Sequence, residues 1–250
     1  MFGRIMWPAL GAGCAAGVVF AVLQIFLTTP LILHAERYEA SLSGSHYAQV
    51  VPSVLKSGTA DGAQLWQVHG DAHTEQAWEP EDGLERMAYT ALTAVLTGVG
   101  YGLLLVSAMA LKGGAISPRS GLAWGVAGFI AFAMAPAMGL PPELPGSAAA
   151  DLMSRQIWWA GTVIATVIGI AGLVFARNPV WSAASVVLIA IPHIVGAPEA
   201  GGYVSDAPAE LAAEFVSVSL GASLVFWAVL GSVAALLWTR GEPGRSPVGA

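Results

Sequence analysis

Histidine and carboxylate side chains are the groups in this sequence that could bind a metal ion, and one short stretch collects several of them. The chain has 5 histidines and 16 acidic residues, and imidazole and carboxylate ligands suit divalent first-row metals. The segment His69–Glu75 reads His-Gly-Asp-Ala-His-Thr-Glu. On a helix its histidines would lie one turn apart, and on an extended segment its ligands would share one side. We therefore predict His69, Asp71 and His73 as metal ligands; the alternative is an ordinary solvated loop.

A second pattern recurs at the ends of three apolar segments, where a proline is followed six or seven residues later by a glutamate. The three stretches are Pro30–Glu36, Pro136–Glu143 and Pro192–Glu199. A proline inside a membrane helix bends the axis and frees a backbone carbonyl, and such broken ends are tolerated where protein or water satisfies the backbone. This pattern predicts a common vestibule for a cation; the alternative is three independent helix ends at the membrane surface. Its candidate metal ligands are His193, Glu143, His34, Glu36 and Glu199.

His193 is the strongest of these candidates because it is the only histidine inside an apolar stretch. A polar residue at membrane depth is a functional candidate by default. The alternative is a structural histidine that bonds to a carbonyl freed by the neighbouring proline.

The composition is that of an integral membrane protein. Hydrophobic residues make up 56% of the 250-residue chain and charged residues only 10%, against roughly 25% charged residues in ordinary soluble domains. The net charge of −6 excludes a nucleic-acid-binding protein, which would need a basic surface. A single cysteine, Cys14, excludes an intramolecular disulfide and a cysteine-rich metal site.

The apolar segments predict an all-α, polytopic transmembrane helical bundle that forms one membrane domain over residues 1–250. A helix needs about 20 apolar residues to cross the bilayer, and helices pair all their backbone groups within one segment. Five segments reach or approach that length, and a sixth, Val180–Val195, is shorter. The six predicted spans are 5–33, 87–111, 122–140, 157–176, 180–195 and 215–238.

The distribution of charge favours six spans over five, with both termini in the cytoplasm. Six spans place on the inner side most of the basic residues, namely Arg4, Lys112, Arg119, Arg177, Arg240 and Arg245. They also place nearly all acidic residues outside, most of them in one long acidic loop over residues 34–86. This arrangement follows the positive-inside rule. Omitting the short segment Val180–Val195, which is the fifth span in chain order, would put Arg240 and Arg245 outside.

Glycine pairs at four-residue spacing predict close contacts between helices. Small residues at this spacing let helix backbones approach each other in lipid, and we expect them to pack helices within this chain. The pairs are Gly13 with Gly17, Gly98 with Gly102, and Gly121 with Gly125.

Motifs typical of the common hydrolases are absent. The sequence has no Gly-x-x-x-x-Gly-Lys-Ser/Thr phosphate loop, no Gly-x-Ser-x-Gly elbow and no His-Glu-x-x-His zinc motif. We therefore expect no enzymatic activity and no permanently bound cofactor.

The segments around the span ends resemble the CbtA family, proposed cobalt transporter subunits of bacteria. The most distinctive run is Gly-Leu-Pro-Pro-Glu-Leu-Pro-Gly at residues 139–146. The other matching segments are 11–17, 30–36, 135–136, 155–159 and 191–198. Family members are usually described with five spans, whereas the charge pattern here favours six.

The resemblance implies a multi-pass protein of the bacterial inner membrane that takes part in cobalt uptake for cobalamin synthesis. It also implies a partner, a small single-span, histidine-rich subunit of the CbtB kind. The transported ion would be a divalent metal; nickel and zinc remain open, because nitrogen and oxygen ligands do not select cobalt by affinity. A membrane scaffold or assembly factor without transport activity is the alternative function.

Overall fold

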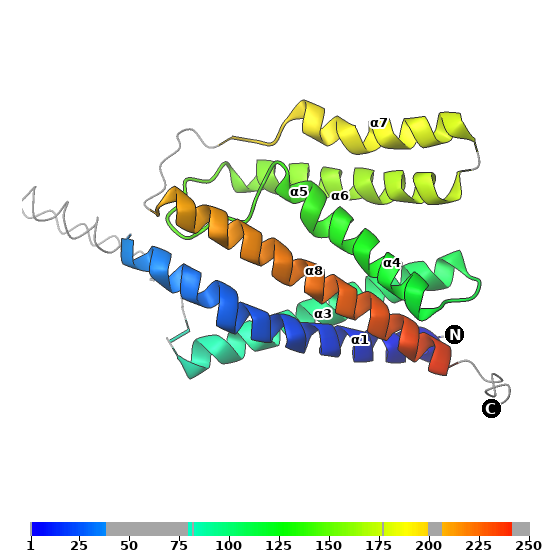
Figure 1. Ribbon diagram of the computed structural model, residues 1–250, viewed down its shortest axis with the longest axis horizontal. Helices are drawn as coiled ribbons and strands as arrows, with labels where there is room; N and C mark the ends of the chain where they lie inside the picture. The colour runs from blue at the N-terminus through cyan, green and yellow to red at the C-terminus, as the bar shows by residue number, and fades with distance from the viewer. Residues whose placement is uncertain (1, 39–79, 82, 177, 200–206, 242–250) are drawn as a thin grey trace, which may run out of the picture.

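The computed structural model describes residues 2–38, 80–81, 83–176, 178–199 and 207–241 (Figure 1). The predicted ligands His69, Asp71 and His73 lie outside the described residues. Helix α1 (Phe2–Leu23) continues into a π-helix, η1 (Gln24–Thr28). The backbone then stays helical to Tyr38. His34 and Glu36 therefore lie on a helix, because no proline or glycine follows Pro30 before Tyr38 to interrupt it.

The remaining elements are helical too, and the chain runs back and forth between two ends of one bundle (Figure 1). The first residues of α1 and the last residues of α8 lie at one end of the bundle, which we call the terminal end. Helices α3, α6 and α8 begin at the opposite end, which we call the pocket end. These elements are α3 (Leu84–Lys112), α4 (Pro118–Phe129), the π-helix η2 (Ile130–Met134), α5 (Ala135–Ala137), α6 (Leu152–Phe175), α7 (Pro179–Val195) and α8 (Ala209–Arg240).

The predicted all-α helical membrane bundle is confirmed. Five helical segments are long and apolar enough to cross a membrane. The sixth, α7, has 17 residues, about 25 Å of helix, and is the short span that the sequence left open. It runs beside α6 in the opposite direction (Figure 1).

Local sequence signals begin and end these helices. Asp151 caps α6 by accepting a hydrogen bond from the backbone N–H of Ser154 at 3.0 Å. Ser117 caps α4 in a reciprocal capping box with Ser120. At its far end α7 stops at Gly196, whose φ of 87° suits glycine.

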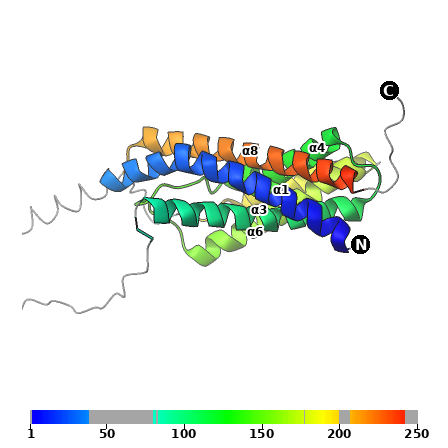
Figure 2. The same cartoon turned by 90° about the horizontal axis from the view of Figure 1, so that it is seen from below.

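The α1–α3 contact is built on glycine, as the sequence predicted. A Cβ atom added to Gly13 would lie 2.5 Å from the Cα atom of Val99, and one added to Gly102 would lie 2.5 Å from the carbonyl oxygen of Ala9. Only glycine, whose side chain is a single hydrogen atom, lets the two backbones approach this closely. Figure 2 shows α1 and α3 running alongside each other at a shallow angle over much of their length.

The other glycines join the remaining helices. A Cβ atom on Gly121 of α4 would lie 2.6 Å from the carbonyl oxygen of Gly231 in α8, and Gly125 faces the same stretch of α8. In the α6–α7 contact, Gly172 faces Ser185. All three predicted glycine pairs therefore pack helices within this chain.

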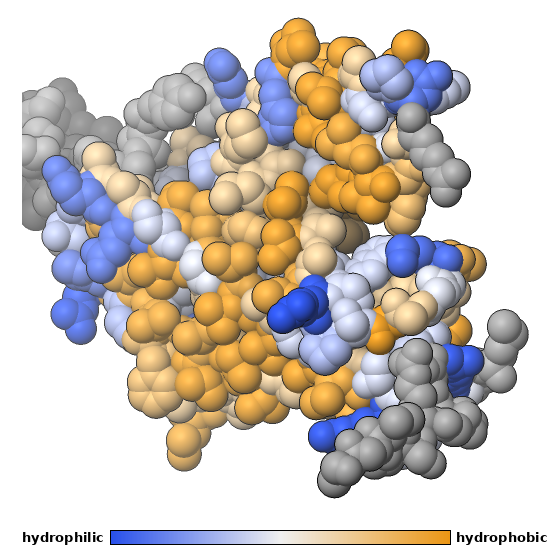
Figure 3. Space-filling view, turned by 45° about the vertical axis from the view of Figure 1, so that its right-hand side comes forward, coloured by the Kyte–Doolittle hydropathy of each residue, from blue (hydrophilic) through white to orange (hydrophobic). Residues whose placement is uncertain are grey.

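The flanks of the bundle expose apolar side chains. Leu96 of α3, Leu104 of α3 and Ile164 of α6 each keep more than half of their surface exposed. Figure 3 shows a broad apolar face, with hydrophilic residues gathered mostly toward the two ends. This surface is what a lipid-facing bundle requires, because the lipid rather than protein covers it.

Candidate functional site

The three stretches Pro30–Glu36, Pro136–Glu143 and Pro192–Glu199 are called the proline-broken ends after the sequence prediction, although the backbone stays helical past Pro30 to Tyr38 and past Pro192 to Val195. Two of them meet at the pocket end of the bundle. Ala35, beside Glu36, and Leu144, beside Glu143, are buried in one apolar cluster with Leu211 of α8. This cluster fixes the end of the first helix against the loop that follows α5. The ends of the first and third predicted spans therefore lie together.

The third proline-broken end joins them through Trp158 of α6. The Trp158 indole Nε1 donates a hydrogen bond to the carbonyl oxygen of Pro192 at 3.2 Å. A Cβ atom on Gly139 would meet both Trp158 and Ala197, the latter at 2.9 Å. The half-buried His193 lies edge-on to Trp158, with ring centroids 6.0 Å apart. Its position in the bundle is thus set by contact with α6.

Two of these ends each contain a π-helix that the sequence analysis did not predict, η1 before Pro30 and η2 before Pro136. The N–H of Thr29 bonds to the carbonyl of Gln24, and the N–H of Ala135 bonds to the carbonyl of Ile130. Each donor directly precedes a proline, whose ring clashes with the carbonyl four residues earlier in a regular helix. The wider π turn relieves that clash. Such turns occur frequently at functional sites.

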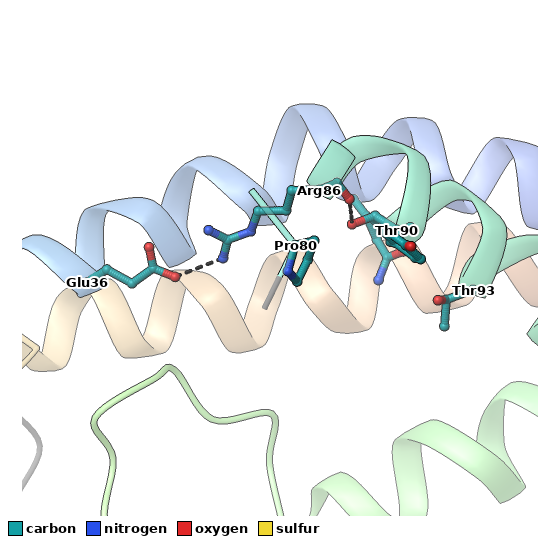
Figure 4. A pocket seen from close by; sticks show the side chains of 7 residues that line it. Glu36, Pro80, Arg86, Thr90 and Thr93 are labelled. Atoms are coloured by element: carbon teal, nitrogen blue, oxygen red, sulfur yellow. Dashed lines mark hydrogen bonds and ion pairs between the residues drawn. The ribbon is translucent and has the colours of Figure 1, made fainter. Parts of the chain in front are cut away.

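The first pocket lies between the end of the first helix and the start of α3. It encloses about 730 Å³. An ion pair crosses it, in which Nη2 of Arg86 donates to Oε1 of Glu36 at 2.8 Å (Figure 4). Both side chains are about one-third exposed. The remaining lining is largely polar and consists of Gln24, Pro80, Tyr89, Thr90 and Thr93.

The second pocket lies between η2, α5, the loop after α5, α6 and α8, and encloses about 480 Å³. It also contains an ion pair: Nη2 of Arg155 donates to Oε2 of Glu143 at 2.8 Å, with both side chains about one-third exposed. Phe132 and Trp159 line the same pocket, and Phe132 stacks on the buried Trp227 with ring centroids 5.5 Å apart.

An aspartate stands just before α6. The backbone N–H of Ser154, and then its hydroxyl, donate to Asp151 and lower the pKa of that carboxyl. Asp151 therefore adds a negative charge at the pocket end at neutral pH.

The other predicted ligands occupy more exposed positions. His34 is exposed, with its ring 5.4 Å from that of Tyr38, and Glu199 is exposed after the end of α7. Within the described part of the chain, no three histidine, cysteine or acidic side chains lie close enough to hold a metal ion together. Glu36 and Glu143 each contact an arginine instead.

The sequence analysis did not place Arg86 or Arg155 in the site. Both lie in the first turns of a helix, α3 and α6, at the pocket end. A basic residue in the first turns of the span that follows the Pro30 and Pro136 ends was the available signal. The polar face of Gln24, Thr90 and Thr93 was hidden because each of these residues is isolated among apolar neighbours.

The bundle and its pockets define a multi-pass helical membrane protein with two carboxylate-containing pockets at one end, the first lined mostly by polar residues and the second mostly by apolar ones. Comparison with known families gives the particular family. Residues 2–239 match the family described as probable cobalt transporter subunit (CbtA), and the chain belongs to this family. No curated protein and no solved structure gives a significant match.

Membership makes this chain a subunit of the cobalt transport class, with a metal ion as its substrate. The role described for the family is transport. The resemblance seen at the span ends is thereby confirmed, and it extends over nearly the whole chain.

Proposed function

We propose that the chain admits divalent cobalt from the outer face of the membrane, through a vestibule at the pocket end. The observation that carries this proposal is the assembly of three proline-broken ends there, with Glu36 and Glu143 each lining a pocket. Carboxylate oxygens attract divalent cations and can replace part of their water shell.

The orientation rests on the basic residues. Arg4, Lys112, Arg119 and Arg240 belong to the segments at the terminal end, which the positive-inside rule assigns to the cytoplasm. The pocket end then faces outward. Entry of a divalent cation is favoured by about 4.6 kcal/mol at a potential of 100 mV, since each charge contributes about 2.3 kcal/mol.

We further propose the bacterial inner membrane as the location and a small single-span, histidine-rich subunit of the CbtB kind as the partner. Both proposals follow from family membership. The lipid bilayer is the surrounding medium of the five long apolar helices.

A membrane scaffold, the alternative function, would offer glycine-lined helix faces to a partner. Gly13, Gly98 and Gly121 instead contact other helices of this chain. The cobalt transport proposal therefore accounts for more of the site.

Replacing His193 with alanine is expected to lower cobalt uptake by about tenfold, a loss typical of groups that support a metal path. Its imidazole lies beside Trp158 at the junction of α6 and α7, where two proline-broken ends are in contact. The measurement is uptake of radioactive cobalt by cells, normalised to the amount of protein in the membrane.

Ile194→Ala is the matched control, because Ile194 is the next residue along and is 80% exposed. It should transport cobalt as the unchanged protein does. Equal uptake by the His193→Ala and Ile194→Ala variants, at equal protein level, would remove His193 from the path.

A further inference from the structure

We infer that Arg86 and Arg155 compete with the transported cation for the two carboxylates, Glu36 and Glu143, and so set the affinity for the metal. Each guanidinium forms an ion pair with a carboxylate oxygen that an entering cation would bind. This inference rests on the proposed function. It assigns the arginines a role in affinity and release that is separate from holding the fold together.

The first support is that the arrangement occurs twice in the chain. In both copies a π-helix ends two residues before a proline, and a glutamate follows that proline six or seven residues later. In both copies an arginine in the first turns of the next helix in the described chain donates Nη2 to that glutamate at 2.8 Å. Corresponding interruptions in two parts of a transporter are a pointer to its binding site.

The third proline-broken end lacks this arrangement. Helix α7 has no π turn before Pro192, and α8 begins Ala-Glu-Leu-Ala-Ala-Glu with no basic residue. The ion pair therefore does not follow simply from a helix that ends at a proline.

The second support is the exposure of the pairs. Each of the four side chains retains about a third of its surface, and both pairs line pockets. A fully buried pair would leave an uncompensated charge when separated, which costs several kcal/mol. A partly exposed pair is weak and its partners can be resolvated. A doubly charged cation can therefore displace a singly charged guanidinium.

The third support is the lining of the first pocket. Thr93 and Gln24 line it together with Thr90, whose hydroxyl donates to the backbone carbonyl of Arg86 at 2.8 Å (Figure 4). Hydroxyl and amide oxygens can complete the coordination of a cation held by Glu36. Gln156 and Ser223 offer similar groups in the second pocket.

The test compares cobalt affinity in Arg86→Gln and Glu36→Gln variants, which should change it in opposite directions. Removing the competitor should lower the KM for cobalt uptake about three- to fivefold, the range expected for an ion pair of this exposure. Removing the ligand should raise KM. Arg86→Lys should stay close to the unchanged protein, because lysine keeps the positive charge. Arg155→Gln should repeat the effect of Arg86→Gln in the second pocket.

The control is Arg37→Gln, because Arg37 is exposed on the helix beside Glu36 and lines neither pocket. A KM that rises in both Arg86→Gln and Glu36→Gln, at unchanged protein level, would show a purely structural pair and overturn the inference. Absence of saturable uptake by the unchanged protein would instead contradict the proposed function. In that event equilibrium cobalt binding to purified protein decides the inference: tighter binding by Arg86→Gln supports it, and equal, weaker or no binding overturns it.

Discussion

Replacing Gly98 with leucine is expected to destroy the α1–α3 contact and with it the stability of the bundle. A side chain at Gly98 would overlap the carbonyl oxygen of Gly13 and lie 3.1 Å from the backbone of Gly17. These neighbours are backbone atoms and cannot rotate away. In lipid, helix association depends on such close packing rather than on the hydrophobic effect.

The expected cost of Gly98→Leu is about 3 kcal/mol or more, at the upper range of overpacking effects because rigid backbone is on both sides. That corresponds to a change of about a hundredfold in the ratio of folded to unfolded protein. The measurement is thermal unfolding of the detergent-solubilised protein, followed by loss of the monodisperse peak in size-exclusion chromatography.

The matched control lies two residues along the same helix. A Cβ atom on Gly100 meets nothing within 4 Å, so Gly100→Leu should unfold at the temperature of the unchanged protein or above it, because leucine favours helix over glycine. If Gly98→Leu were as stable as Gly100→Leu, the backbone contact between α1 and α3 would be wrong.

Neutralising both pocket carboxylates, as Glu36→Gln with Glu143→Gln, is expected to abolish cobalt uptake. Glutamine keeps the size of the side chain but removes the charge that attracts and binds a divalent cation. Each pocket would then keep a guanidinium without its carboxylate and become positive, which repels cobalt. We expect uptake to fall to background, a loss of more than about a hundredfold, measured with radioactive cobalt at matched protein level.

Glu85→Gln separates this effect from a general loss of negative charge at the pocket end. Glu85 lies beside Arg86 in the first turn of α3, is exposed, and lines neither pocket. It should retain full uptake. Full uptake by the double variant would exclude both pockets from the cation path.

Hydropathy predicted the helices, and glycine spacing predicted residues at which they pack closely, because both depend on local patterns. The helix ends in the structure differ from the predicted span ends where residues are polar but still favour a helix. The last span was expected to begin at Phe215, whereas α8 begins at Ala209. Glu210 and Glu214 are unsuited to hydrocarbon but are good helix formers, so the helix extends past the apolar segment.

The grouping of the proline-broken ends could also be predicted, because alternating spans return to the same side of a membrane. The ion pairs could not. Glu36 and Arg86 are separated by 50 positions and Glu143 and Arg155 by 12, and which basic side chain reaches which carboxylate depends on how the helices pack. The π turns were equally hidden, since they arise from the geometry before Pro30 and Pro136 rather than from a residue pattern.

Cobalt flux through the purified protein tests the central proposal most directly. The chain would be reconstituted into lipid vesicles with an inside-negative potential, with and without a single-span CbtB-type partner, and radioactive cobalt added outside. We predict saturable uptake that requires the chain and increases with the potential. Vesicles that contain correctly folded protein and partner, yet accumulate no more cobalt than empty vesicles, would contradict the proposal and favour the scaffold function.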